Sequence, residues 1–230
     1  GDIPRYDFLF LAALVIQAIL YVTGIETKDE IRVIFMFHII GLVLEIFKTS
    51  SQIGSWSYPE AGFFKIYDVP LYSGFMYAAV ASYISQSWRF MQLEFRGYPP
   101  YFLSIPLSMA IYLNFFTHHF IPDFRWLLAA LVLILFSRTW VHFTVTEKRR
   151  KMPLLLAFLL IGFFIWIAEN IATFLGAWQY PNQEAGWSLV DISKISSWFL
   201  LVIISIIIVA DLKHFKQRSS RRDFSAGRGD

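Results

Sequence analysis

Two glutamates in apolar surroundings are the residues of this sequence best placed to carry chemistry. Glu45 lies in the run HIIGLVLEIFK, and Glu169 is the last residue but one of the run FLLIGFFIWIAEN. A buried carboxyl group can hold its proton and act as a general acid. An ionisable group in a membrane span costs about 3 kcal/mol at the centre of the bilayer, so it marks a functional site. We therefore predict Glu45 and Glu169 as catalytic acid/base residues.

The same aromatic motif follows each glutamate. GSWSYPEAGF at 54–63 and GAWQYPNQEAGW at 176–187 share Gly-x-Trp-x-Tyr-Pro and then Glu-Ala-Gly-aromatic. The glycine and the proline fix a turn, which a simple belt of interfacial aromatic residues does not require. We interpret the two loops as a folded cap over a cavity, with a membrane-surface anchor as the alternative. The aromatic residues assigned to substrate binding are Trp56, Tyr58, Trp178 and Tyr180.

Further polar residues lie on the same predicted helix faces, because offsets of three and seven return to one side of a helix. Those assigned to substrate binding are Lys48, His38, Asn114, His118 and Asn170. Two alternatives stay open: an ion pair between Glu45 and Lys48 one turn apart, and polar contacts that merely hold helices together. Arg138 and His142, one turn apart in a predicted helix, form a separate level deeper in the membrane.

Composition places the chain in a membrane. Of its 230 residues 57% are hydrophobic and 16% charged, and its mean hydropathy is +0.53, whereas soluble domains carry about 25% charged residues. With no cysteine, disulfides, thiol catalysis and thiolate metal sites are excluded. We predict no metal site and no nucleic-acid partner, and the cofactor is unknown. Membrane lipids and a hydrophobic small-molecule substrate are the expected partners, and the sequence does not indicate the oligomeric state.

Seven segments meet the requirement of roughly 20 apolar residues for a transmembrane helix. They are 8–25, 32–48, 69–87, 101–119, 125–144, 153–176 and 194–212. Fourteen Lys and Arg residues fall on the side of the C-terminus and five on the other, which predicts a cytoplasmic C-terminus and an outside N-terminus.

The expected architecture is thus an all-α, multi-pass protein of the bacterial cytoplasmic membrane with two parallel three-helix repeats. Repeat one covers 8–87, a linker helix covers 101–119 and repeat two covers 125–212. Residues 1–212 form the seven-helix transmembrane domain. The basic segment 213–230 is expected to be a disordered cytoplasmic tail.

Two family resemblances rest on these residues. HIIGLVLEIFKTSSQIGSWSYPE, VPLYSGFMYAAV, NFFTHHFIPD and AENIATFLGAWQYP together resemble the YoaT-type bacterial integral membrane proteins, domain of unknown function 817. This resemblance implies a fold and a location but no activity. A membrane glutamate followed by Gly-x-Trp-x-Tyr and Val-Pro is also similar to the carotenoid hydratase and lycopene cyclase families. That second likeness implies acid-initiated chemistry on isoprenoid double bonds, although the paired Pro-x-Glu-Glu motif of the cyclases is missing here.

The leading hypothesis is an uncharacterised membrane protein with a polar cavity in the outer leaflet, doing acid/base chemistry on a lipid or isoprenoid-like substrate. A small transporter is the alternative, because two three-helix repeats and a linker helix resemble the plan of the SWEET sugar carriers. A non-catalytic membrane scaffold whose aromatic loops bind a partner is the third reading.

Overall fold

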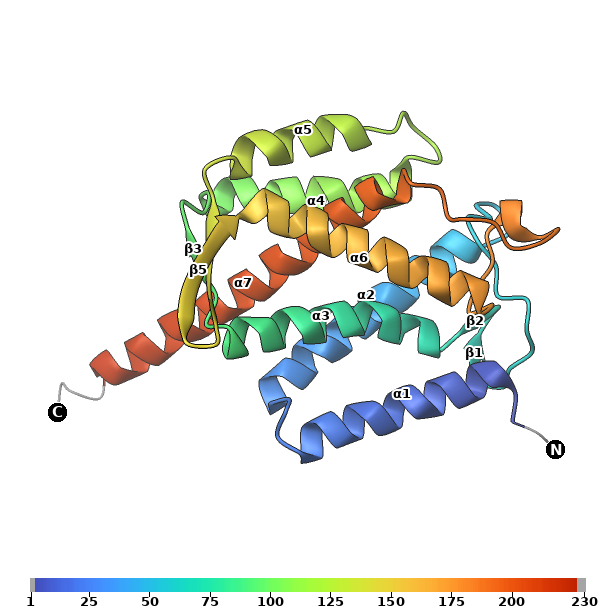
Figure 1. The fold of residues 1–230 in the computed structure, drawn as a ribbon, viewed down its shortest axis with the longest axis horizontal. Helices are drawn as coiled ribbons and strands as arrows, with labels where there is room; N and C mark the ends of the chain where they lie inside the picture. Colours follow the sequence, from blue (N-terminus) through green and yellow to red (C-terminus); the bar gives the residue numbers. More distant parts are fainter. Residues whose placement is uncertain (1–2, 227–230) are drawn as a thin grey trace.

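The computed structural model describes residues 3–226, with side chains described as far as residue 210. This part of the chain forms seven α-helices (Figure 1). Their bounds are α1 (Arg5–Val22), α2 (Lys28–Thr49), α3 (Tyr72–Phe90), α4 (Tyr101–Thr117), α5 (Arg125–Phe136), α6 (Leu154–Phe174) and α7 (Lys194–Ala226). A capping box fixes the start of α2, where the Thr27 hydroxyl accepts from the Glu30 amide and the Glu30 carboxylate accepts from the Thr27 amide.

The helices run back and forth between two ends of the molecule (Figure 1). One end holds the chain's N-terminus and the loops that follow α2, α4 and α6, including both aromatic motifs. The opposite end holds the loops that follow α1, α3 and α5. The helix pairs α2 with α3 and α6 with α7 pack most extensively, and α7 also contacts α3, α4 and α5. The apolar core is formed mainly by α3 to α7, with Ile111, Val132, Phe158 and Ile203 among its fully buried side chains.

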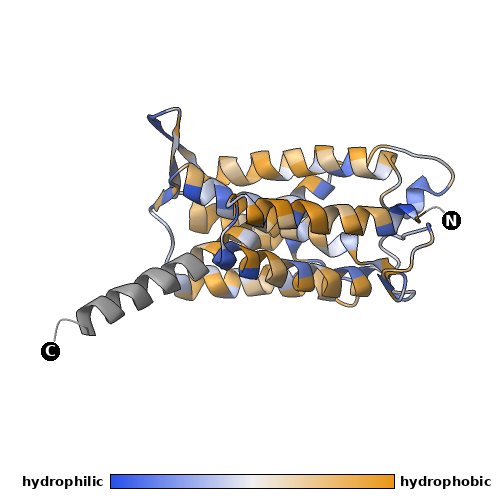
Figure 2. Cartoon of the chain, turned by 90° about the horizontal axis from the view of Figure 1, so that it is seen from below, coloured by the Kyte–Doolittle hydropathy of each residue, from blue (hydrophilic) through white to orange (hydrophobic). Residues whose placement is uncertain are grey.

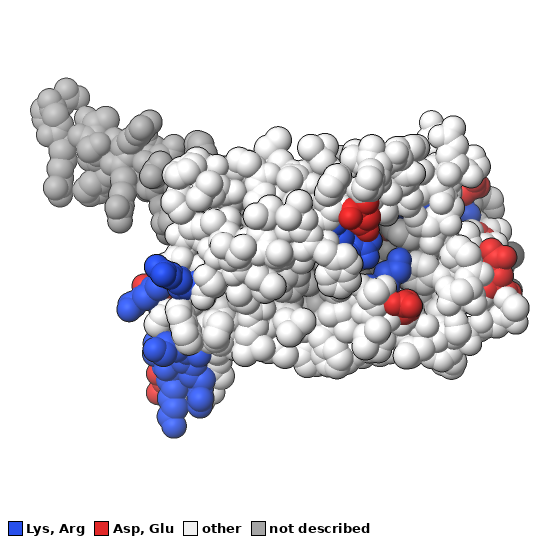
Figure 3. Space-filling view, turned by 90° about the horizontal axis from the view of Figure 1, so that it is seen from above, with Lys and Arg blue, Asp and Glu red and all other residues white. Residues whose placement is uncertain are grey.

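Hydrophobic residues predominate along the helices of the bundle (Figure 2), and many of their side chains are exposed. By length and hydropathy, α1 and α6 are each able to cross a membrane, and α4, α5 and the first part of α7 are apolar but shorter. Exposed side chains on α5 include Trp126, Leu127 and Ile134, each more than half accessible. On the face in Figure 3, Lys and Arg gather at one end, and the surface between the two ends is uncharged apart from one small group of acidic and basic side chains.

Two small antiparallel sheets correct the all-α prediction. One pairs β1 (Lys65–Ile66) with β2 (Val69–Pro70) beside the first aromatic motif. The other joins β3 (Glu94–Arg96), β4 (Trp140–Val145) and β5 (Lys148–Pro153) in that order at the opposite end (Figure 1). The described part of the chain is therefore mostly helical rather than purely helical.

The predicted helix 125–144 is wrong beyond residue 136, where α5 ends. The following run TWVHFTV is rich in β-branched and aromatic residues, which suit a strand. Thr146 and Glu147 then form a two-residue hairpin turn with φ of 47° and 67°, the handedness that such turns need. Arg138 consequently lies in the exposed turn after α5 and His142 lies on β4, so they do not form a polar level on one helix.

The last helix is longer than the sequence predicts. α7 continues to Ala226, beyond the expected end at 212, so the first part of the basic segment 213–230 is helical. Residues 227–230 lie outside the described part of the chain, as do the side chains of 211–226.

Candidate functional site

The two copies of the aromatic motif lie against each other at one end of the bundle. Each begins with a glycine at positive φ, Gly54 at 56° and Gly176 at 74°, which glycine adopts without strain. Ser57 and Gln179 then form an antiparallel bridge in which each amide donates to the other's carbonyl, at 2.9 and 3.0 Å. Both residues stand between Trp and Tyr of their motif. Equivalent positions therefore contact each other reciprocally, as they do across a two-fold axis.

Glu45 on α2 fastens the first motif to the helices. Its side chain is 1% exposed, and its carboxylate accepts three hydrogen bonds. The Trp56 indole and the Tyr58 hydroxyl donate to Oε2 at 2.8 and 2.6 Å. The Tyr77 hydroxyl, on α3, donates to Oε1 at 2.7 Å. One carboxylate thus connects α2, α3 and the motif loop.

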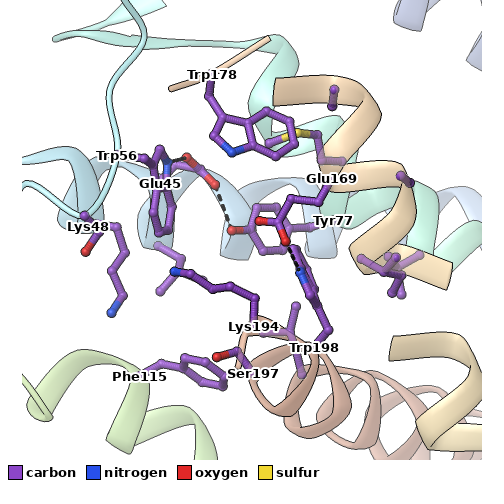
Figure 4. Close-up of a pocket in the computed structure, with 18 of the residues that line it drawn as sticks. Glu45, Lys48, Trp56, Tyr77, Phe115, Glu169, Trp178, Lys194, Ser197 and Trp198 are labelled. Atoms are coloured by element: carbon purple, nitrogen blue, oxygen red, sulfur yellow. Dashed lines mark hydrogen bonds between the residues drawn. The ribbon is translucent and has the colours of Figure 1, made fainter. Parts of the chain in front are cut away.

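Glu169 on α6 has a closely similar environment. Its side chain is 3% exposed, the Tyr180 hydroxyl donates to Oε1 at 2.5 Å, and the Trp198 indole of α7 donates to Oε2 at 2.7 Å. Each glutamate therefore accepts from the tyrosine of its own motif and from an aromatic donor on the helix that follows. Figure 4 shows the Tyr77 side chain between the two carboxylates.

The carboxyl groups are the candidate sites of proton exchange in this cluster. A carboxylate offers about four acceptor positions, and a tyrosine hydroxyl both donates and accepts. Burial first, and then the charge of Glu45, raises the pKa of Tyr58 well above its ordinary value of 10. Burial and the charge of Glu169 likewise raise the pKa of Tyr180. Both loop tyrosines therefore stay neutral, while the carboxyl groups keep free positions for a further donor.

A cavity of about 640 Å³ opens beside the two carboxylates (Figure 4), within the range of ligand-binding pockets. Besides Glu45 and Glu169, its polar wall includes Lys48, His118, Arg125 and Lys194. The remaining wall is mainly apolar and comes from α3, α4, α6 and α7, with Val80, Phe115, Ile161, Phe164 and Leu201 among its residues. The cavity is therefore amphipathic, with its charged groups gathered at one side.

Seven residues that the sequence assigns to the site line this cavity: Glu45, Glu169, Lys48, His118, Trp56, Trp178 and Tyr180. Tyr58 lies behind them as a donor to Glu45. Trp178 is 8% exposed and packs in the cavity wall beside the motif tyrosines. The structure thus brings the two predicted carboxylates and three of the four predicted motif aromatics to one cavity.

His38, Asn114 and Asn170 lie outside the cavity lining. The His38 ring packs 4.5 Å from the Phe75 ring, between α2 and α3. The Asn114 side chain donates to the Asp123 carboxylate at 3.0 Å and shapes the loop before α5. The side-chain oxygen Oδ1 of Asn170 accepts a hydrogen bond from the Val190 amide at 2.9 Å and holds the loop before α7. These contacts give all three side chains structural roles.

The suggested ion pair between Glu45 and Lys48 is absent among the described residues. The Lys48 ammonium group instead lies 2.8 Å from Nε2 of His119. Nearby, burial favours a protonated Asp123, but the Asn114 side chain, the Arg125 amide and the Arg125 guanidinium outweigh it and hold the pKa of Asp123 below its usual value. Asp123 is therefore ionised at neutral pH and pairs with Arg125 at 3.3 Å.

Four residues of the site were missed by the sequence prediction: Tyr77, Trp198, Arg125 and Lys194. A signal for the first two exists, because Tyr77 lies 19 residues after the motif Tyr58 and Trp198 lies 18 after Tyr180. An aromatic donor at nearly equal distance in both copies marks the second partner of each glutamate. Arg125 and Lys194 begin α5 and α7, and no sequence pattern links them to each other.

Comparison with known proteins identifies relatives but no activity. The sequence model of a family described as "Protein of unknown function (DUF817)" matches residues 1–206. The chain is 58% identical over 217 residues to "Uncharacterized protein YoaT" of Bacillus subtilis (strain 168), covering 94% of this chain and 81% of that protein. No solved structure matches the chain.

Proposed function

The chain belongs to the DUF817 family of proteins of unknown function, and from this premise we propose that it is a multi-pass membrane enzyme with a lipid-like substrate. In this proposal the cavity beside the motif loops takes up an apolar molecule, and Glu45 and Glu169 transfer protons to or from it. The observation that carries the proposal is that two buried carboxylates, each held by aromatic donors, share one mainly apolar cavity.

The apolar surface supports placement in the bacterial cytoplasmic membrane. Monomeric soluble proteins rarely expose contiguous apolar patches of more than a few hundred Å². Here α1 and α6 are long and apolar enough to cross a membrane, and exposed apolar side chains continue on α4 and α5. We propose seven crossings that run between the two ends of the bundle, with the motif loops outside. Two three-helix halves joined by α4 agree with the reciprocal Ser57–Gln179 pairing.

This placement predicts opposite labelling of two loops. Because the chain has no cysteine, single cysteines can be introduced without background. In intact protoplasts, a membrane-impermeant maleimide is expected to label Glu184→Cys, which lies in the second motif loop. Lys148→Cys, exposed at the start of β5, is expected to react only after permeabilisation. Equal labelling of the two variants before permeabilisation contradicts the proposed topology.

A catalytic role predicts loss of turnover when either carboxyl group becomes an amide. Expression of the wild-type chain is expected to change the amount of one or a few apolar species in a lipid extract, measured by mass spectrometry. Glu45→Gln and Glu169→Gln are expected to lower the rate of this change by about 100-fold or more, the usual contribution of general acid/base catalysis. Glu60→Gln, at a partly exposed position of the first motif, is the matched control.

The experiment separates catalysis from folding. Glutamine keeps the size of glutamate and one acceptor oxygen, so size-exclusion profiles of the variants in detergent are expected to match the wild type. If both amide variants change the lipid extract as the wild-type chain does, the enzyme proposal is wrong. The buried apolar core to which α4, α5, α6 and α7 contribute supports a binding chamber over a transport path.

A further inference from the structure

We infer that the cavity binds an amphiphile with an anionic head group, whose charge is held by Lys48, Arg125 and Lys194. This inference rests on the proposed function and names its substrate class. The three cations come from α2, α5 and α7 and line one cavity. The chemistry that they recognise is a carboxylate or phosphate attached to an apolar chain.

Lys48 is a buried cation that forms no ion pair with the side chains that the structure describes. It is 5% exposed, and among the described residues its ammonium group contacts only Nε2 of His119, at 2.8 Å. Burying an ammonium group away from water costs several kcal/mol unless it is paired, so buried charges normally have partners. An anion in the cavity supplies the missing partner.

Lys194 adds a second positive charge at the same place. It is half-buried at the start of α7, its ammonium group lies 4.6 Å from the centre of the Tyr180 ring, and it has no ion pair among the side chains that the structure describes. Figure 4 shows the ammonium groups of Lys48 and Lys194 directed toward the same part of the cavity. The first turn of α7 adds the positive end of a helix dipole.

Arg125 completes the cationic wall, and the two glutamates of the cavity form their hydrogen bonds with other groups. The Arg125 side chain is 22% exposed, and its guanidinium pairs with Asp123 through one nitrogen, at 3.3 Å. Arg125, Lys48 and Lys194 are close enough to repel one another. Nearby carboxylates offset part of this repulsion, since Asp123 attracts Lys48 and Glu169 attracts Lys194. Glu45 and Glu169 accept their hydrogen bonds from tyrosine and tryptophan rather than from these cations. The arrangement therefore favours an added anion.

The rest of the cavity suits a hydrocarbon chain. Beyond the charged side its wall consists of aliphatic and aromatic side chains, among them Val80, Ile161, Phe164, Ile165 and Leu201. A free inorganic anion leaves this apolar wall uncovered, whereas a neutral lipid leaves Lys48 and Lys194 without an ion pair. An amphiphile with one negative head satisfies both parts, and its head then lies beside the two carboxylates proposed to transfer protons.

The test compares three probes on the purified full chain in a neutral detergent, with intrinsic tryptophan fluorescence as the readout, since Trp56, Trp178 and Trp198 line the cavity. Dodecyl phosphate is expected to bind at least tenfold more tightly than dodecanol, which has the same chain and no charge. Inorganic phosphate is expected to bind weakly or not at all. Tight binding of inorganic phosphate alone overturns the amphiphile assignment in favour of a free anion.

Variants assign the charge to its residues. Lys48→Met and Lys194→Met are each expected to weaken dodecyl phosphate binding by about tenfold or more, the range for loss of a charge-assisted hydrogen bond, and to leave dodecanol binding unchanged. Lys194→Arg is expected to retain binding. Lys28→Met, at the exposed first position of the helix that carries Lys48, is the matched control. Thermal unfolding of each variant in detergent verifies that it is folded.

The outcomes also separate this inference from the proposed function. If dodecyl phosphate and dodecanol bind equally and the lysine variants change neither, the anionic head group is wrong while an apolar substrate stands. If neither probe binds to the folded wild-type chain, both the head group and the proposed cavity substrate are wrong.

Discussion

Replacement of Glu45 by leucine is expected to lower the free energy of unfolding by about 2–5 kcal/mol. Leucine has a similar size, so the main loss is the acceptor for three donors. Trp56, Tyr58 and Tyr77 each donate to this carboxylate, and a buried donor left without an acceptor costs about 1–3 kcal/mol. Removal of a buried charge offsets part of this cost. Thermal or denaturant unfolding of the purified chain in detergent measures the difference.

A matched control and a double substitution make this expectation specific. Glu60 is also a glutamate, but its side chain is 40% exposed and pairs with Arg5 at the surface, so Glu60→Leu is expected to cost at most about 1 kcal/mol. Tyr77→Phe is expected to destabilise the wild-type chain, because Glu45 loses a donor, and to have little effect in the Glu45→Leu background. If Glu45→Leu has the same free energy of unfolding as the wild type, the Glu45 carboxylate does not stabilise the motif loop.

This network shows why the residues of the candidate site were easier to predict from the sequence than the contacts that assemble it. Glu45, Glu169 and the motif aromatics were recognisable because charge in an apolar run and a repeated Gly-x-Trp-x-Tyr-Pro are local patterns. The contact between the motif copies at Ser57 and Gln179 is not local, because it joins segments over 100 residues apart. The partners of each glutamate on α3 and α7 depend on the same tertiary packing.

The errors of the sequence prediction have local causes. Hydropathy alone reads 125–144 as one apolar segment, since Trp140, Val141 and Phe143 continue the run after α5. The hairpin turn at Thr146 and Glu147 uses residues that do not signal a turn of this handedness, because such turns usually contain glycine or asparagine. A count of apolar residues therefore does not detect the boundary between the helix and the strand, although the β-branched residues after residue 138 indicate it.

The closest helix packing of the site lies between α2 and α3, where two glycines face two aromatic rings. A Cβ atom added at Gly41 would lie 2.4 Å from Cδ2 of Tyr77, and one added at Gly74 would lie 2.6 Å from Nδ1 of His38. His38 and Gly41 are three residues apart on α2, as are Gly74 and Tyr77 on α3. Each helix therefore packs an aromatic ring over the glycine of the other helix. Small residues such as glycine permit this close approach of two helices.

Gly41→Ala and Gly74→Ala are each expected to lower the free energy of unfolding by about 1–3 kcal/mol, the usual cost of overpacking a core. Alanine has a higher helix propensity than glycine, by about 1 kcal/mol. The measured loss of unfolding free energy is therefore the cost of the steric clash minus this gain. Gly74→Ala is expected to be the more severe, because its Cβ would also lie 2.8 Å from the backbone carbonyl oxygen of His38, which no rotamer change can move. Unfolding in detergent measures both variants.

The double variant distinguishes one shared interface from two independent clashes. Once α2 and α3 have moved apart for one added methyl group, the second methyl group is accommodated at little further cost. The losses of unfolding free energy in the two single variants are therefore expected to sum to more than the loss in the double variant.

Gly41→Ala is also expected to displace Tyr77 from Glu45. In the proposed enzyme, the turnover of this variant is expected to fall even at temperatures where the chain stays folded. Wild-type stability of either single variant contradicts this packing. If the losses of unfolding free energy in the two single variants add up to the loss in the double variant, the two glycines act separately.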